Sequence, residues 1–136
     1  MRISVKSKYA IKMLIDIAEN SSNGNVSLSE ISERQNISKK YLEQIVPMLT
    51  KTGIVRANRG SRGGYTLNQP VGKCTLGDIL RATEGDLLPI EDTACSSDES
   101  IQFLWIGMHD AFNKYIDSIS LQDIIERKNE SYFYTI

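Results

Sequence analysis

Two helix-start signals that lie close together, at Ser27 and Ser38, constrain this chain more than any other feature. The first, Ser27-Leu-Ser-Glu30, is a capping box, in which the serine caps the helix and the glutamate reaches back to the serine amide. Only a short helix over about residues 28–35 and a tight connection fit before Ser38 caps a second helix. That second helix has one apolar seam at i, i+3, i+4, i+7 spacing, formed by Leu42, Ile45, Val46 and Leu49. The pattern predicts a helix–turn–helix over about residues 28–51.

The segments around this motif are predicted to complete a winged helix–turn–helix domain over residues 1–84. Apolar residues at spacings of three and four predict a helix over residues 7–20, before the motif. Two short apolar stretches around a glycine-rich loop predict a β-hairpin after it, the wing, over about residues 54–67. A threonine cap then starts a helix over about residues 76–84.

The C-terminal part of the chain is predicted to form an acidic loop over residues 85–99 and a dimerisation helix with a tail over residues 100–136. The helix covers residues 100–118, and Ser120 caps a last short helix after it. The apolar stripe of the long helix is too broad for one small domain to cover, which favours a dimer seam over packing on its own domain alone. The predicted dimer-interface residues are Ile101, Leu104, Trp105, Met108, Phe112 and Tyr115. The expected fold class is mainly α with a small β-hairpin: a winged helix–turn–helix domain plus a long C-terminal dimerisation helix.

Charge is divided unevenly between the two halves of the chain. Residues 1–70 carry eleven Lys and Arg against five Asp and Glu, whereas residues 71–136 carry five against twelve. A basic half suggests contact with a polyanion, although such an imbalance also arises by chance as a solvated face. An adaptor that kept this fold but lost DNA binding would not need the basic half. We therefore expect double-stranded DNA as the partner.

The start of the second helix of the motif carries residue types that suit base and phosphate contacts. Lysines contact phosphate or guanine, and the hydroxyls of Ser38 and Tyr41 can donate to phosphate. Gln44 can read adenine, and Glu43 can accept from the cytosine amino group. The alternative for Glu43 is an ion pair with a lysine one helical turn earlier.

Two arginines flanked by glycines form the tip of the predicted wing. Such a wing can insert an arginine into a narrow minor groove, and the glycines allow positive φ and close backbone approach. The alternative is a solvated surface hairpin, while the phosphate-loop and dinucleotide-binding spacings are missing. The complete set of candidate DNA-binding residues is Arg2, Lys6, Ser38, Lys39, Lys40, Tyr41, Glu43, Gln44, Arg56, Arg59 and Arg62.

Catalytic and metal-binding patterns are not found in the sequence. The chain has one histidine and two cysteines, Cys74 and Cys95, and none of the common hydrolase or metalloprotease motifs. His109 lies at the edge of an apolar stripe, where a lone histidine is usually a boundary residue. We therefore expect no enzyme activity, no metal and no cofactor.

Nothing in the sequence predicts export or membrane insertion. No apolar run approaches the length of a membrane span, and the N-terminal segment lacks the apolar core of a secretory signal. Two cysteines make no disulfide framework. We expect a soluble, cytoplasmic protein.

Several stretches together resemble the IscR/NsrR/CymR family of bacterial winged helix–turn–helix regulators. They are Met1-Arg-Ile-Ser-Val-Lys6-x-x-Tyr9-Ala10, Ile31-Ser-Glu-Arg-Gln35-Asn-Ile-Ser38, Tyr41-Leu-Glu-Gln44, Arg59-Gly-x-x-Gly-Gly-Tyr65 and Leu104-Trp105. The resemblance covers nearly the whole chain. It implies a homodimeric transcription factor, usually a repressor, that binds a palindromic operator. It also implies base reading by the recognition helix at Ser38, Tyr41, Glu43 and Gln44, and insertion of Arg59 into the minor groove.

The resemblance also bears on the signal that the protein senses. Iron–sulfur members carry three closely spaced cysteines before the long helix, whereas here that loop has only Cys95, and Cys74 lies 21 residues upstream. Clusters usually take four thiolate ligands. The chain therefore resembles the cluster-free, CymR-like branch, which implies control of sulfur and cysteine metabolism and a cysteine-synthase-type partner protein. The alternative is an iron–sulfur-sensing regulator with an atypical ligand set involving Cys95 and His109. As for Cys95 itself, nearby acidic residues favour an inert thiol over a redox switch.

Overall fold

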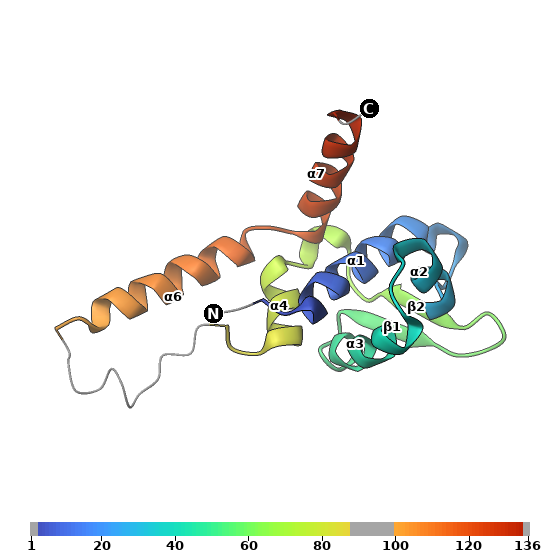
Figure 1. Ribbon diagram of the computed structural model, residues 1–136, viewed down its shortest axis with the longest axis horizontal. Coiled ribbons are helices and arrows are strands. Elements are labelled where there is room, and N and C mark those ends of the chain that lie inside the picture. The colour runs from blue at the N-terminus through green and yellow to red at the C-terminus, as the bar shows by residue number, and fades with distance from the viewer. Residues whose placement is uncertain (1–2, 88–99, 135–136) are drawn as a thin grey trace.

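Four helices and a β-hairpin surround one apolar core, and two further helices extend from it (Figure 1). The computed structural model describes residues 3–87 and 100–134. In chain order its elements are α1 (Val5–Asn20), the 3-10 turn η1 (Ser21–Asn23), α2 (Leu28–Gln35), α3 (Lys39–Lys51), β1 (Val55–Asn58), β2 (Gly64–Leu67), the 3-10 turn η2 (Val71–Lys73), α4 (Leu76–Glu84), α6 (Gln102–Asp117) and α7 (Leu121–Tyr134). The fold class predicted from the sequence is confirmed.

The serine caps that the sequence indicated are present at both helix starts, but the Glu30 carboxylate accepts from the Ser27 hydroxyl and not, as predicted, from the Ser27 amide. The Ser27 hydroxyl oxygen accepts from the Glu30 amide at 3.2 Å, and its proton is donated to the Glu30 carboxylate at 3.1 Å. Ser38 Oγ accepts from the Tyr41 amide at 3.1 Å. Between these helices Asn36 adopts a left-handed conformation with φ of 54°, which ends α2 and turns the chain toward α3. The helix–turn–helix therefore lies where the sequence predicted it.

The core is built from the apolar stripes of α1 and α3 and reaches into the C-terminal part of the chain. Ala10, Met13, Leu14 and Ile17 of α1 are fully buried. The predicted seam of α3 is also buried, and α3 continues through Pro47. Leu121 of α7 belongs to the same core cluster. The C-terminal part of the chain thus shares a core with the N-terminal domain instead of packing separately.

The wing is an antiparallel pair whose register joins Val55 to Leu67 and Asn58 to Gly64. Both strands lie within the predicted wing over residues 54–67. A third segment joins the pair, because Val26 forms an antiparallel bridge with Tyr65. The sequence did not indicate this bridge, since a single bridging residue has no strand-like pattern around it.

Helix α6 extends away from the core (Figure 1). It is as long as α1, at 16 residues, and Ile116 is its one buried residue. Arg81 of α4 ties its C-terminal end to the domain through the Asp117 carboxylate, at 2.7 and 3.0 Å. The last helix, expected to be short, has 14 residues, and the predicted Ser120 cap precedes it. None of the described helices has the length and apolar character needed to cross a bilayer.

Candidate nucleic-acid interface

The N-terminal half of α3 presents most of its predicted DNA-contacting side chains to solvent. Ser38, Lys39, Lys40, Glu43 and Gln44 are exposed. The apolar seam of the same helix faces the core, so these polar residues share the outward face. Such a face offers donors on the lysines and Gln44 and acceptors on Glu43 and Gln44, the kinds of group that pair with base edges and phosphates in a major groove.

Tyr41 differs from its neighbours and corrects the expectation that its side chain is exposed. It is half-buried against the core. Its ring makes an edge-to-face contact with Tyr9 of α1, with ring centroids 5.2 Å apart and an interplanar angle of 83°. Aromatic pairs of this geometry stabilise beyond their buried area. The ring therefore braces α3 against α1, and Tyr41 is only partly accessible from solvent.

Among the residues that the structure describes, none forms an ion pair with the Glu43 carboxylate. Within residues 3–87 and 100–134, the ion pairs formed include neither Glu43 nor the lysines that precede it. The alternative of a helix-surface ion pair is therefore not seen, and the carboxylate is available to accept from a base.

The tip of the wing exposes Arg59 and Arg62 between the two strands. Gly60 adopts φ of 118°, a conformation that L side chains rarely take. Gly63 has an ordinary φ, but a Cβ there would lie 2.7 Å from the Asn58 carbonyl oxygen. The glycines therefore serve the two purposes predicted, positive φ at one position and close backbone approach at another.

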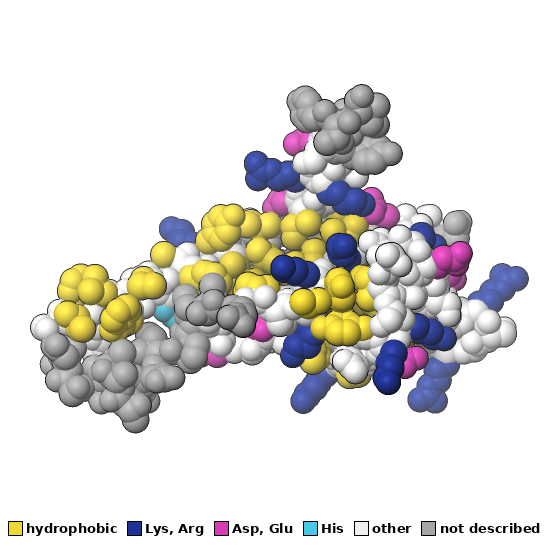
Figure 2. Space-filling model, in the orientation of Figure 1, with side chains coloured by type: hydrophobic (Ala, Val, Ile, Leu, Met, Phe, Trp, Pro, Cys, Tyr) yellow, Lys and Arg dark blue, Asp and Glu magenta, His cyan; other side chains and the backbone are white. Residues whose placement is uncertain are grey.

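The remaining candidates lie at the margins of this surface. Arg56 on β1 is exposed and Lys6 on α1 is half-buried, while Arg2 lies outside the described residues. Figure 2 shows Lys and Arg side chains gathered over the part of the molecule that holds α1–α3 and the hairpin, whereas the part formed by α6 is mainly apolar on this face.

A buried carboxylate fixes the helix–turn–helix to α1. Asp16 accepts from Arg34 Nε at 3.0 Å, from Arg34 Nη2 at 2.8 Å and from Gln35 Nε2 at 3.0 Å. The hydrogen bond to Asp16, and then its charge, raise the pKa of Arg34. Sequence reasoning missed this group, and the only signal was one acidic residue within the apolar stripe of α1.

Helix α6 carries the largest exposed apolar area of the described chain. Seven large apolar residues of α6 and its N-cap are 39–67% exposed: Ile101, Phe103, Leu104, Trp105, Ile106, Met108 and Tyr115. Phe112, also predicted to be part of the seam, is half-buried. Phe103 and Ile106 were not predicted, because they fall on the opposite side of the helix from the stripe. Apolar side chains therefore surround the N-terminal half of α6.

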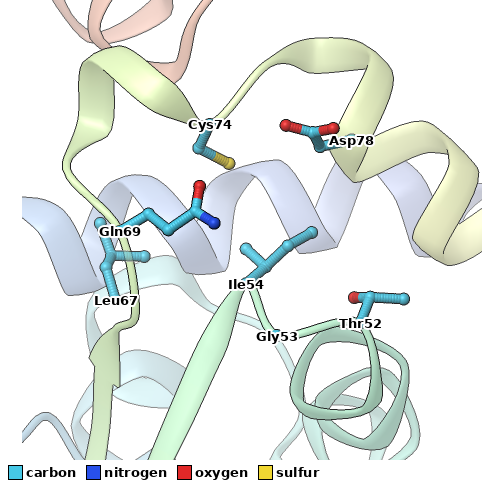
Figure 3. A pocket seen from close by; sticks show the side chains of 7 residues that line it. All are labelled: Thr52, Gly53, Ile54, Leu67, Gln69, Cys74 and Asp78. Carbon is cyan, nitrogen blue, oxygen red and sulfur yellow. The ribbon is translucent and has the colours of Figure 1, made fainter.

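The cysteine that the structure describes does not suit a metal site. Cys74 is buried and lines a small pocket of about 140 Å³, where its thiol lies between Gln69 and Asp78 (Figure 3). Burial, and then the charge of Asp78, raise the pKa of the thiol to about 11. The described residues contain no group of three His, Cys, Asp or Glu placed to hold a metal ion. Cys95, the other cysteine of the chain, lies outside the described residues.

Comparisons with known proteins agree with this arrangement. Residues 3–127 match the Rrf2 family, described as iron-dependent transcriptional regulators. The chain is 34% identical to the HTH-type transcriptional regulator CymR of Bacillus subtilis over the whole of both chains. It is 32% identical to the HTH-type transcriptional regulator IscR of Xenorhabdus nematophila, over 94% of this chain and 81% of that protein.

Solved structures give the same result. The structure of CymR, named the global cysteine regulator of B. subtilis, is similar with a TM-score of 0.80 and 36% identity, over 93% of this chain and 98% of that one. The structure of T. potens IscR is similar with a TM-score of 0.76 and 33% identity, over 98% of this chain and 96% of that one.

Proposed function

The chain belongs to the Rrf2 family of DNA-binding transcriptional regulators, which are not enzymes, and we propose that it is a repressor that binds a two-fold symmetric operator as a homodimer paired through α6. The observation that carries this proposal is the apolar surface of α6. In the described part of the chain, every exposed large hydrophobic side chain except Val5 lies on α6 or at its N-cap. Contiguous exposed apolar surface on a soluble domain marks an interaction site.

A two-fold pairing through α6 fits the geometry that operator binding needs. A symmetric dimer uses the same patch on both protomers, so a single apolar helix face is sufficient. Helix–turn–helix dimers place two recognition helices in successive major grooves, about 34–36 Å apart. The α6 surface extends away from α3 and the wing, so pairing there leaves both reading surfaces free.

The proposed contacts fall into three kinds. Phosphate contacts from Lys6, Lys39, Lys40 and Arg56 supply affinity, and each gives a slope of about −0.9 in log affinity against log salt. Glu43 and Gln44 read base edges in the major groove, with help from the half-buried Tyr41. Arg59 reads the narrow minor groove.

Sedimentation equilibrium and gel-shift titration of matched variants test this function. Trp105→Asp puts a charge into the apolar surface, so we expect monomers at micromolar concentration and at least about a hundredfold loss of operator affinity. Lys114→Asp is the control, because Lys114 is an exposed residue of the same helix outside the predicted stripe. A wild-type protein that is monomeric, or that shows no preference for any stretch of its own chromosome at moderate salt, would refute the proposal.

We also propose that the protein works without an iron–sulfur cluster. Although the family is described as iron-dependent, this chain has two cysteines in all, and one is a buried thiol with a raised pKa. Thiolates, not thiols, bind iron. Protein purified without oxygen should be colourless and iron-free and should still bind its operator. Visible absorption with stoichiometric iron would instead support the alternative, an iron–sulfur sensor with an atypical ligand set.

Similarity to CymR along the full chain supports a role in sulfur and cysteine metabolism. We propose that the protein acts in the cytoplasm on such genes and binds a cysteine-synthase-type partner. Genome-wide mapping of bound sites tests the first part, and calorimetric titration with the purified synthase of the same organism tests the second. Sites near unrelated genes, or no heat of binding, would refute the respective part.

A further inference from the structure

The wing is held against the segment between η1 and α2 by backbone hydrogen bonds. The Val26 amide donates to the Tyr65 carbonyl at 3.0 Å, and the Tyr65 amide donates to the Val26 carbonyl at 2.8 Å. These bonds reach the start of β2 but not the tip, where the arginines lie. The position of the tip therefore depends on other contacts.

Asn25 supplies the contact at the tip. Its side-chain amide donates from Nδ2 to the carbonyl oxygen of Arg62 at 2.9 Å. Its Oδ1 accepts from Asn58 Nδ2 at 2.7 Å, and Asn58 Nδ2 also donates to Thr66 Oγ1 at 3.1 Å. Asn58 and Thr66 lie on opposite strands of the hairpin, so this chain of hydrogen bonds joins the tip, both strands and the segment before α2.

Steric features of the wing agree with this docking. A Cβ at Gly64 would lie 2.7 Å from the Val26 carbonyl oxygen and 3.1 Å from the Asn25 Cβ. Real Cβ atoms essentially never approach a carbonyl oxygen so closely, so the start of β2 meets the Asn25 segment only because residue 64 has no side chain. The close contact brings the Asn25 amide within reach of the tip backbone.

We propose that Asn25 is a positioning residue for the wing: it holds the backbone at Arg62, so that the Arg62 side chain meets the operator in one orientation. The proposal rests on the proposed DNA-binding function. Ordering a mobile loop on binding costs free energy, and a tip that is already ordered avoids that cost. Asn25 lies outside the recognition helix and the wing, so its effect on affinity passes through Arg62.

The test compares two asparagines that make the same kind of bond. Asn25→Ala should weaken binding by about three- to tenfold, measured on a duplex that the wild-type protein selects from a random-sequence library. Asn20→Ala is the matched control, because Asn20 Nδ2 donates to the Asp16 carbonyl at 2.8 Å, away from the wing. Asn20→Ala should leave affinity unchanged. Equal losses in the two variants would overturn the proposal.

A double-mutant cycle with Arg62→Ala separates positioning from general destabilisation. If Asn25 acts through Arg62, adding Asn25→Ala to Arg62→Ala should weaken binding no further, and either variant should make the salt dependence less steep. Fully additive losses would overturn the proposal. If Arg62→Ala itself leaves affinity unchanged, the wing assignment of Arg62 is wrong, and the positioning role falls with it while operator binding stands.

Asn58→Ala gives a second, graded measurement. It removes the hydrogen bond that orients the Asn25 amide but keeps the bond from Asn25 to Arg62 possible. We expect a smaller loss than for Asn25→Ala, in the same direction. A larger loss at equal thermal stability would assign the positioning role to Asn58 and overturn the one proposed for Asn25.

Discussion

Two arginine–carboxylate pairs with nearly the same geometry but different burial allow a direct test of what holds the reading domain together. Arg34 binds Asp16 at 2.8 and 3.0 Å, and Arg81 binds Asp117 at 2.7 and 3.0 Å. The Asp16 side chain is 1% exposed, whereas the Asp117 side chain is 46% exposed. Replacing each arginine with methionine keeps most of the apolar stem and removes the charge.

The two substitutions should cost different amounts of unfolding free energy, because water can reach the carboxylate that Arg81 leaves but not the buried carboxylate that Arg34 leaves. Removing one partner of a buried pair costs about 3–5 kcal/mol, and removing one from an exposed pair costs about 0–1 kcal/mol. Gln35 still donates to Asp16, and the Arg34 side chain is itself 37% exposed. We therefore expect Arg34→Met to cost about 3 kcal/mol, near the lower limit of the first range, and Arg81→Met less than about 1 kcal/mol.

Urea denaturation followed by circular dichroism measures both costs. All variants must be compared at one protomer concentration, because the unfolding of a dimer depends on concentration. Costs within about 0.5 kcal/mol of each other would refute the reasoning that burial decides the value of the pair. Asp16→Leu combined with Arg34→Met should be more stable than Arg34→Met alone, since no unpaired carboxylate is then buried.

Three further predictions concern single residues. The pKa of the Cys74 thiol is about 11 in the folded protein, above its ordinary value near 9, so the unfolded chain loses this proton first as the pH rises. The contribution of the protonated thiol to stability is therefore complete below pH 9 and is lost between pH 9 and 11. Urea titrations at pH 8 and pH 10.5 should show a loss of stability about 2 kcal/mol larger than the loss that Cys74→Ala shows between the same pH values. Gly77→Ala, which in an open helix would stabilise by up to about 1 kcal/mol, should stabilise by clearly less here, because its Cβ would overlap Asp117 Oδ1 and lie 2.7 Å from Arg81 Nη1 and so displace this exposed ion pair; a gain of the full ~1 kcal/mol in urea denaturation would contradict this. Arg59→Ala should weaken operator binding by about tenfold while the dimer stays folded, and an unchanged gel-shift titration would remove Arg59 from the interface.

Local features of the fold were predictable from the sequence. The Ser27 and Ser38 caps predicted the starts of α2 and α3, and the α2 bounds agree to the residue. These predictions succeeded because a cap satisfies amides within the first turn of its own helix, so every partner lies a few residues away. The apolar seam of α3 was also readable, since helical periodicity alone puts its residues on one face.

Contacts between distant residues were not predictable. The bond from Asn25 to Arg62 joins residues 37 apart, and the pair of Asp16 with Arg34 joins residues 18 apart. Nothing near Asp16 in the sequence names its partner, because a buried carboxylate accepts from whichever donor the packing brings to it. Tyr41 was predicted to face DNA with its neighbours, but its ring packs on Tyr9 of α1, a residue 32 positions away in the sequence.

Helix α6 shows the same division between local and long-range information. Its apolar stripe was readable as a pattern of spacing, but Phe103 and Ile106 lie outside that pattern and are also exposed. Helical periodicity predicts which side chains share a face of the helix, but it does not predict which face becomes covered by another part of the protein. Which face is covered depends on where rigid elements meet in space. Arg81 of α4 contacts the C-terminal end of α6, and the N-terminal half of α6 lies beyond the core.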